Sequence, residues 1–263
     1  MKSSDLGPWR LRLTALALLF LTLALLASCG RKGPVRPRLA SLPAAPTEVS
    51  IAQQGDDFVV SWKIPERNQD GAPAEDLLAF HIYRMVYAAA DGCPTCRDPE
   101  ELIATIILNH PEPAVQLGKR LYWRDERIAP GTGHAYLIVP VTIGGYEGNA
   151  AGTHRAWQEP PPSPVDLQAE PGNQQVRLTW TAPAALPAGQ LLLGYNIYRR
   201  PATGTFPPMP LNADPLREPQ LTDRAGEAGR EAVYRVTTLV RSGEQLVEST
   251  PSAEAVAPSQ GVR

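Results

Sequence analysis

Two versions of one strand pattern occupy most of this chain, and they constrain its fold more than any other feature. Each version contains a segment ending in Trp, a segment ending in Ile-Tyr-Arg and a segment containing Tyr, in the same order. The segments are residues 58–62, 80–84 and 135–139 in the first version and residues 176–180, 195–199 and 232–236 in the second. Short alternating segments separated by Gly, Pro, Asn and Asp are typical of β-strands. The sequence therefore predicts an all-β chain of two tandem β-sandwiches.

The alternation of apolar and polar residues predicts which side chains face each core. In residues 195–198, Tyr195 and Ile197 are the inward candidates, which leaves Asn196 and Tyr198 outward, and the opposite phase stays open. Proline accounts for 28 of the 263 residues, about double the usual share of ~5%, which argues against long helices. Two short stretches, residues 99–107 and 216–221, remain candidates for short helices.

The motifs of the second version resemble a fibronectin type III module, and the first version carries matching residues. They are Pro164-x-x-Leu167, Leu178-x-Trp180-x-x-Pro183, Gly194-Tyr195-x-x-Tyr198 and Tyr234-x-Val236, with Trp62-x-x-Pro65, Phe80-x-x-Tyr83-Arg84 and Tyr136 in the first version. The resemblance implies immunoglobulin-like sandwiches in which Trp62 and Trp180 are core residues between two sheets. It also implies that Tyr136 and Tyr234 are tyrosine corners, with a buried ring and a hydroxyl bonded to upstream backbone.

The first residues of the chain predict an export signal. Lys2, Arg10 and Arg12 precede an uninterrupted weakly polar to apolar run of fourteen residues, 13–26. At ~1.5 Å per residue this run is shorter than the ~30 Å hydrocarbon core of a bilayer, so a permanent N-terminal anchor helix is disfavoured.

The next residues, Leu26-Ala27-Ser28-Cys29-Gly30, resemble the lipobox of bacterial lipoproteins. The resemblance implies cleavage after Ser28 and acylation of both the thiol and the freed amine of Cys29. Two or three acyl chains make a stable membrane anchor, whereas one chain binds only reversibly. Gly30 stands where Asp would retain such a protein in the inner membrane of Gram-negative bacteria, which implies the outer membrane, facing the periplasm.

A basic segment rich in Pro and Gly follows Cys29 and predicts an extended tether. Its four basic side chains either contact anionic lipid headgroups or belong to a spacer that is simply solvated by water, and both alternatives stay open. Residues 29–34 also resemble the mature start of small lipoproteins associated with the lipopolysaccharide-transport translocon.

We therefore expect five parts in the chain, joined end to end. They are the lipoprotein signal peptide 1–28, the tether 29–43, a first sandwich 44–158 with a CxxC-containing insertion, a second sandwich 159–258 and a tail 259–263. The proline-rich residues 159–164 predict a semi-rigid spacer that holds the two sandwiches apart.

The remaining cysteines, Cys93 and Cys96, form a CxxC pair in an exported chain. A thioredoxin-type redox centre would need a helix that starts at Cys93, and Pro99 interrupts such a helix. A c-type haem site would need His where Arg97 stands, and a zinc site would need a second ligand pair, which the four scattered histidines do not supply. We favour a local disulfide that pins the long loop of the first sandwich.

The sequence also limits the classes of function. A formal net charge of −2 provides no cationic field for nucleic acid, so no nucleic-acid partner is expected. No catalytic motif is recognisable, and no cofactor or metal is expected. We expect a lipid-anchored, non-catalytic protein-binding or scaffold module with an envelope protein as partner. The alternative is a carbohydrate-binding module, for which the candidate exposed aromatics are Tyr87, Trp123, Tyr146 and Trp157. A CxxC-based enzyme is the weaker third hypothesis.

Overall fold

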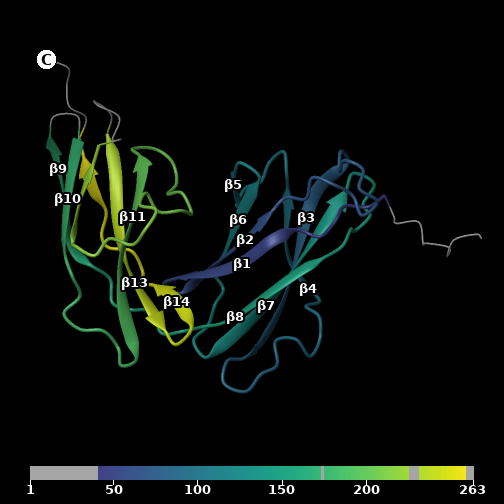
Figure 1. The fold of residues 1–263 in the computed structure, drawn as a ribbon, viewed down its shortest axis with the longest axis horizontal. Helices are drawn as coiled ribbons and strands as arrows, with labels where there is room; N and C mark the ends of the chain where they lie inside the picture. The colour runs from purple at the N-terminus through teal and green to yellow at the C-terminus, as the bar shows by residue number, and fades with distance from the viewer. Residues whose placement is uncertain (1–40, 173–174, 225–230, 259–263) are drawn as a thin grey trace, which may run out of the picture. The chain divides into compact units, whose positions relative to one another are not determined.

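The computed structural model describes residues 41–172, 175–224 and 231–258 (Figure 1). The predicted signal peptide, Cys29, most of the tether and the tail 259–263 lie outside these residues. Every regular element within them is a strand, which confirms the all-β prediction. In the part of the chain that the structure describes, no helix is long and apolar enough to cross a membrane.

Eight strands form the N-terminal sandwich. They are β1 (Thr47–Gln54), β2 (Asp57–Lys63), β3 (Leu77–Ala88), β4 (Glu101–Ile107), β5 (Val115–Leu117), β6 (Arg120–Asp125), β7 (Thr132–Thr142) and β8 (Ala151–Ala156). One sheet contains the order β1-β2-β6-β5, and the other has the order β4-β3-β7-β8. Trp62 of β2 and Phe80 of β3 meet edge to face between the sheets, with ring centroids 5.5 Å apart.

Seven strands form the C-terminal sandwich. They are β9 (Val165–Gly172), β10 (Gln175–Thr181), β11 (Gln190–Pro201), β12 (Gln220–Asp223), β13 (Ala232–Ser242), β14 (Gln245–Glu248) and β15 (Ala255–Ala257). The order β12-β10-β9 makes one sheet, while β13 pairs with β11, β14 and β15 in the other. Trp180 and Tyr195 repeat the contact of the first core, with centroids 5.3 Å apart. Both sandwiches have an immunoglobulin-like strand order.

Neither stretch that was a candidate for a short helix is helical. Residues 101–107 form β4, which pairs antiparallel with β3, because this Ile-rich and Thr-containing segment suits a half-buried pleated surface. Leu216 forms an isolated bridge with Tyr195, and β12 begins at Gln220. Pairing with a strand elsewhere in the fold, rather than local helix propensity, therefore determines the conformation of both segments.

The two predicted corner tyrosines are buried, and both bond to a side chain rather than to upstream backbone. The Tyr136 hydroxyl donates to Asp125 Oδ2 at 2.9 Å, and the Tyr234 hydroxyl donates to Asp223 Oδ2 at 2.8 Å. Each Asp ends a strand eleven residues before its Tyr. The expected backbone acceptor was wrong because a buried carboxylate needs donors of its own.

An arginine completes this arrangement in each sandwich. Arg84 Nη1 lies 3.1 Å from Asp125 Oδ2, and Arg199 Nη1 lies 2.6 Å from Asp223 Oδ2. Burial raises the pKa of the Tyr136 phenol, and the Asp125 carboxylate raises it further. Each tyrosine therefore stays neutral and donates a hydrogen bond to the aspartate of an Arg–Asp ion pair.

The two sandwiches share one sheet, so residues 159–164 do not hold them apart as expected. Strand β14 extends the edge of the C-terminal sandwich and pairs in parallel with β1, with Gln53 opposite Val247 and Gln54 opposite Glu248. The shared sheet runs β11-β13-β14-β1-β2-β6-β5. The last two residues of β1 and of β14 thus pair with each other at an edge that would otherwise be open.

We predict that Tyr136→Phe lowers the free energy of unfolding by about 1–3 kcal/mol, because a buried hydrogen bond to a charged acceptor is lost. Denaturant-induced unfolding of the purified protein measures this change. Tyr146→Phe is the control, since Tyr146 is 69% exposed and should change stability by less than ~0.5 kcal/mol. Equal losses in the two variants would contradict the role given to the Tyr136–Asp125 bond.

Candidate functional site

Side chains reinforce the backbone ladder between β1 and β14. Gln53 is buried, its Nε2 donates to the Gln158 carbonyl at 2.6 Å, and its Oε1 accepts from the Gln158 amide at 3.0 Å. From β8, Arg155 Nη2 donates to the Leu246 carbonyl of β14 at 2.5 Å. The Arg155 bond links β8 to β14, and the two Gln53 bonds hold the end of β1 against the segment that follows β8. We call this region, centred on β1 and β14, the junction.

Glu248, a buried carboxylate at the end of β14, lies at the centre of the junction. It accepts hydrogen bonds from Asn196 Nδ2 at 2.7 Å, the Tyr198 hydroxyl at 2.8 Å and Thr237 Oγ1 at 2.8 Å. Burial raises the pKa of Glu248, whereas the three donors act in the opposite direction. Desolvation therefore favours the neutral form of Glu248, whereas its hydrogen bonds favour the charged form.

The outward phase expected for Asn196 and Tyr198 was correct, but both side chains are buried. Tyr195 and Ile197 face the core of the C-terminal sandwich, and the junction covers the opposite face of β11. A strand buried on both faces does not show simple alternation between apolar and polar residues.

A hydrogen-bonded chain continues from Glu248 into the N-terminal sandwich. Gln54 Nε2 donates to the Tyr198 hydroxyl at 3.0 Å, and Arg124 Nη2 donates to Gln54 Oε1 at 2.6 Å. Arg124 Nη1 also donates to Asp57 Oδ2 at 2.9 Å. Polar side chains of both sandwiches therefore form one network.

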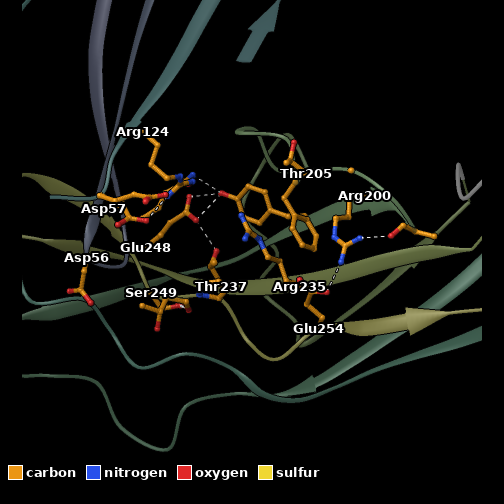
Figure 2. A pocket seen from close by; sticks show the side chains of 18 residues that line it. Asp56, Asp57, Arg124, Arg200, Thr205, Arg235, Thr237, Glu248, Ser249 and Glu254 are labelled. Carbon is orange, nitrogen blue, oxygen red and sulfur yellow. Dashed lines mark hydrogen bonds and ion pairs between the residues drawn. The ribbon is translucent and has the colours of Figure 1, made fainter. Parts of the chain in front are cut away.

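This network borders a cleft with a volume of about 700 Å³, here called the junction cleft (Figure 2). Both sandwiches line it, and eight of its eighteen lining residues are charged. The charged residues are Asp56, Asp57, Arg124 and Glu126 from the N-terminal sandwich, and Arg200, Arg235, Glu248 and Glu254 from the C-terminal sandwich. The cleft is suited to a polar ligand rather than an apolar one.

Arginines and aromatic rings alternate along one wall of the junction cleft. The Arg235 guanidinium carbon lies 4.2 Å from the Phe206 ring centroid and 5.1 Å from that of Tyr198. Arg200 also lies against Phe206, at 5.1 Å. Burial lowers the pKa of Arg235, and the nearby Arg124 lowers it further. Two aromatic rings thus hold the Arg235 side chain in place.

The other residues singled out in the sequence lie away from this cleft. Cys93 and Cys96 form a disulfide in the loop between β3 and β4, as predicted, and both are exposed. Trp62, Trp180, Tyr136 and Tyr234 are buried in the two sandwiches. Within the described ranges, no group of three or more His, Cys, Asp or Glu side chains could hold a metal ion.

The four aromatics considered for carbohydrate binding do not form an exposed row. Trp123 is buried against Tyr136, with ring centroids 6.2 Å apart. Trp157 packs against the same core, and Tyr87 is half-buried. Of the four, only Tyr146 is largely exposed, so they offer no shared platform for a sugar.

Sequence reasoning did not identify Gln54, Glu248 or Arg235 as site residues. Gln54 and Glu248 belong to different versions of the repeat and become neighbours only through the β1–β14 pairing. Arg235 lies directly after a corner tyrosine, and the sequence gives it no partner. The weak signal available was the pair of adjacent glutamines, Gln53 and Gln54, just before Gly55.

Comparisons with known proteins identify fibronectin type III structures but no family or curated relative. No family model and no curated protein matches the chain. A solved Fn3-like protein from Clostridium thermocellum is 24% identical and covers 39% of this chain and 97% of its own, with a TM-score of 0.30. The FN1–FN3 domains of chicken CNTN1 are 13% identical and cover 84% of this chain and 68% of their own, also with a TM-score of 0.30. The fold class of the protein rests on its own strand order and cores.

We predict that Tyr198→Phe weakens the junction, because Glu248 loses a donor and Gln54 loses an acceptor. The free energy of unfolding should fall by about 1–3 kcal/mol, and backbone amides of β14 should exchange with solvent faster. Hydrogen exchange followed by mass spectrometry measures the second effect. Tyr122→Phe serves as the control, since no hydrogen bond of its hydroxyl is found within the described residues. Unchanged exchange in β14 of Tyr198→Phe would refute this account of the junction.

Proposed function

We propose that this protein is a lipid-anchored cell-envelope protein whose two joined sandwiches form a non-catalytic platform for binding another protein. The observation that carries the proposal is the uncovered edge of β4. Cys29 would supply the anchor, and the tether of residues 29–43 would let the platform stand away from an outer-membrane surface facing the periplasm. The carbonyls of Leu42 and Pro43 accept hydrogen bonds from the N-terminal sandwich, and the thirteen residues from Cys29 to Ser41 would reach about 43 Å at ~3.3 Å each if extended.

Strand β4 pairs with β3 on one side. On its other side, the backbone of residues 101–106 has no hydrogen-bond partner among the residues that the structure describes. Residues 102–107 carry no charge, and Leu102 and Ile107 are 49% and 44% exposed. Free edges of this kind recruit another strand unless charge, Pro or a cover blocks them.

In the C-terminal sandwich, a loop lies where β4 lies in the N-terminal sandwich. The open edge of β4 is therefore a difference between the two versions of the repeat. Its strand β11 takes the place of β3, and residues 211–216 lie along its free side. There the Ile197 amide donates to Asn212 Oδ1 at 2.8 Å, and the Tyr195 amide donates to the Leu216 carbonyl at 2.9 Å. The second version of the repeat thus covers the free side of β11 with a loop. The first version instead adds the strand β4, whose outer side is exposed.

The loop before β4 is fixed by bonds that orient the strand. The Cys93–Cys96 disulfide closes the loop tip, and Arg97 Nε lies 3.1 Å from Met85 Sδ of β3. Arg84 Nη2 lies 3.3 Å from Glu101 Oε2 at the start of β4. A preformed edge lowers the conformational entropy lost on binding an extended peptide, which is the mode known as β-augmentation.

We expect Cys29→Ser to release the protein from membranes, because no thiol remains to carry an acyl chain. Fractionation of cells and labelling with a clickable fatty acid measure the two effects. The matched control replaces Cys93 and Cys96 with Ser, which should leave both membrane association and labelling intact. Persistent fatty-acid labelling of Cys29→Ser would contradict the proposed anchor.

A photo-crosslinking amino acid at the exposed Thr105 of β4 should capture an envelope protein in living cells. Ile107→Lys, introduced into the same chain, should reduce the capture at least tenfold, since a charge on the edge opposes strand addition. The control is Leu191→Lys on β11, where Leu191 is 60% exposed but belongs to the covered strand. Equal loss with both substitutions, or capture of glycan without protein, would overturn the proposal.

A further inference from the structure

Arg235 differs from the other arginines of the junction cleft because no carboxylate of the described residues lies within ion-pair distance of it, although Glu248 and Glu254 act on it electrostatically from farther away. Arg124 pairs with Asp57 at 2.9 Å, and Arg200 pairs with Glu254 at 2.8 Å; Figure 2 shows these pairs on opposite sides of the cleft. The structure gives Arg235 no ion pair with any residue it describes, and its buried Nε has no hydrogen-bond partner there. A half-buried guanidinium is therefore left available inside a cleft.

The surroundings of Arg235 favour a planar anion. The rings of Phe206 and Tyr198 lie 4.2 Å and 5.1 Å from its guanidinium carbon, so the rotameric freedom of this long side chain is already restricted. A guanidinium binds a carboxylate through two parallel N–H bonds, and a side chain already held in place loses less entropy when those bonds form.

The acidic residues of the junction cleft narrow the class of ligand further. Asp57 and Glu254 are paired with arginines, and Glu248 is occupied by its three donors. Asp56 and Glu126 also line the cleft; both are exposed, and neither has an ion-pair partner within the described ranges. These two carboxylates disfavour a multiply charged anion such as phosphate and favour a ligand that also carries a positive group.

We infer that the junction cleft binds a short zwitterionic peptide, with its carboxylate on Arg235 and a cationic group at Asp56 and Glu126. A volume of about 700 Å³ lies within the usual range for small-ligand sites. This site is separate from the β4 edge and does not depend on the proposed function. Because both sandwiches line the cleft, a bound peptide would also stabilise their connection.

Titration calorimetry on the full chain purified in detergent tests the inference, with the tripeptide lysyl-alanyl-alanine as the probe. We expect the free tripeptide to bind at least tenfold more tightly than its C-terminal amide, because the amide removes the carboxylate. Arg235→Gln should reduce tripeptide affinity at least tenfold, and Asp56→Asn combined with Glu126→Gln should also reduce it. The matched control is Arg217→Gln, since Arg217 is exposed and does not line the cleft.

A second variant separates binding from folding. Arg235→Lys keeps the charge but loses the planar fork, so it should bind the tripeptide less tightly than the unchanged chain and more tightly than Arg235→Gln. The unfolding temperature of each variant without peptide shows whether the fold is intact. No tripeptide binding at millimolar concentration, equal affinity for the amide, or tighter binding of inorganic phosphate would overturn the inference. Loss of β4 crosslinking would leave these measurements unchanged.

Discussion

The connection between the two sandwiches depends on one buried carboxylate, Glu248. A carboxylate removed from water is destabilised unless donors surround it. Asn196, Tyr198 and Thr237 meet this requirement from two neighbouring strands, and Gln54 links Tyr198 to the N-terminal sandwich. The side-chain positions on β11, β13 and β1 are therefore coupled through a single charge. Electrostatics and strand pairing, rather than the proline-rich linker, determine how the sandwiches are joined.

The two sandwiches share a second device, an Arg-Asp-Tyr group that fastens the end of one sheet to the other. Arg84, Asp125 and Tyr136 form it in the first sandwich. Asp223 and Tyr234 occupy the matching places in the second, with the same separation of eleven residues. The same chemistry thus closes both cores, while the edges of the two sandwiches differ in whether a loop covers them.

Much of the fold could be predicted from sequence, because repeated local patterns determine it. The alternation around Trp62 and Trp180 indicated strands, and the Cys93–Cys96 spacing indicated a short disulfide. The candidate site could not be predicted, because Gln54 and Glu248 are brought together by a pairing between different sandwiches. The segment at β4 was misjudged as a possible helix, since its pairing with β3 is non-local. Asn196 and Tyr198 pointed outward as expected, but no local pattern could reveal the surface that buries them.

The parallel pairing of β1 with β14 has a consequence for how the chain folds. The short strand β14 has its hairpin partner β13 on one side and depends on β1 for the other. Domains generally form in order during synthesis, with the N-terminal one first. The finished N-terminal sandwich would then present β1 as a template on which the last hairpin of the chain aligns its register. The C-terminal sandwich would in this way take the register of β14 from an N-terminal sandwich that is already folded.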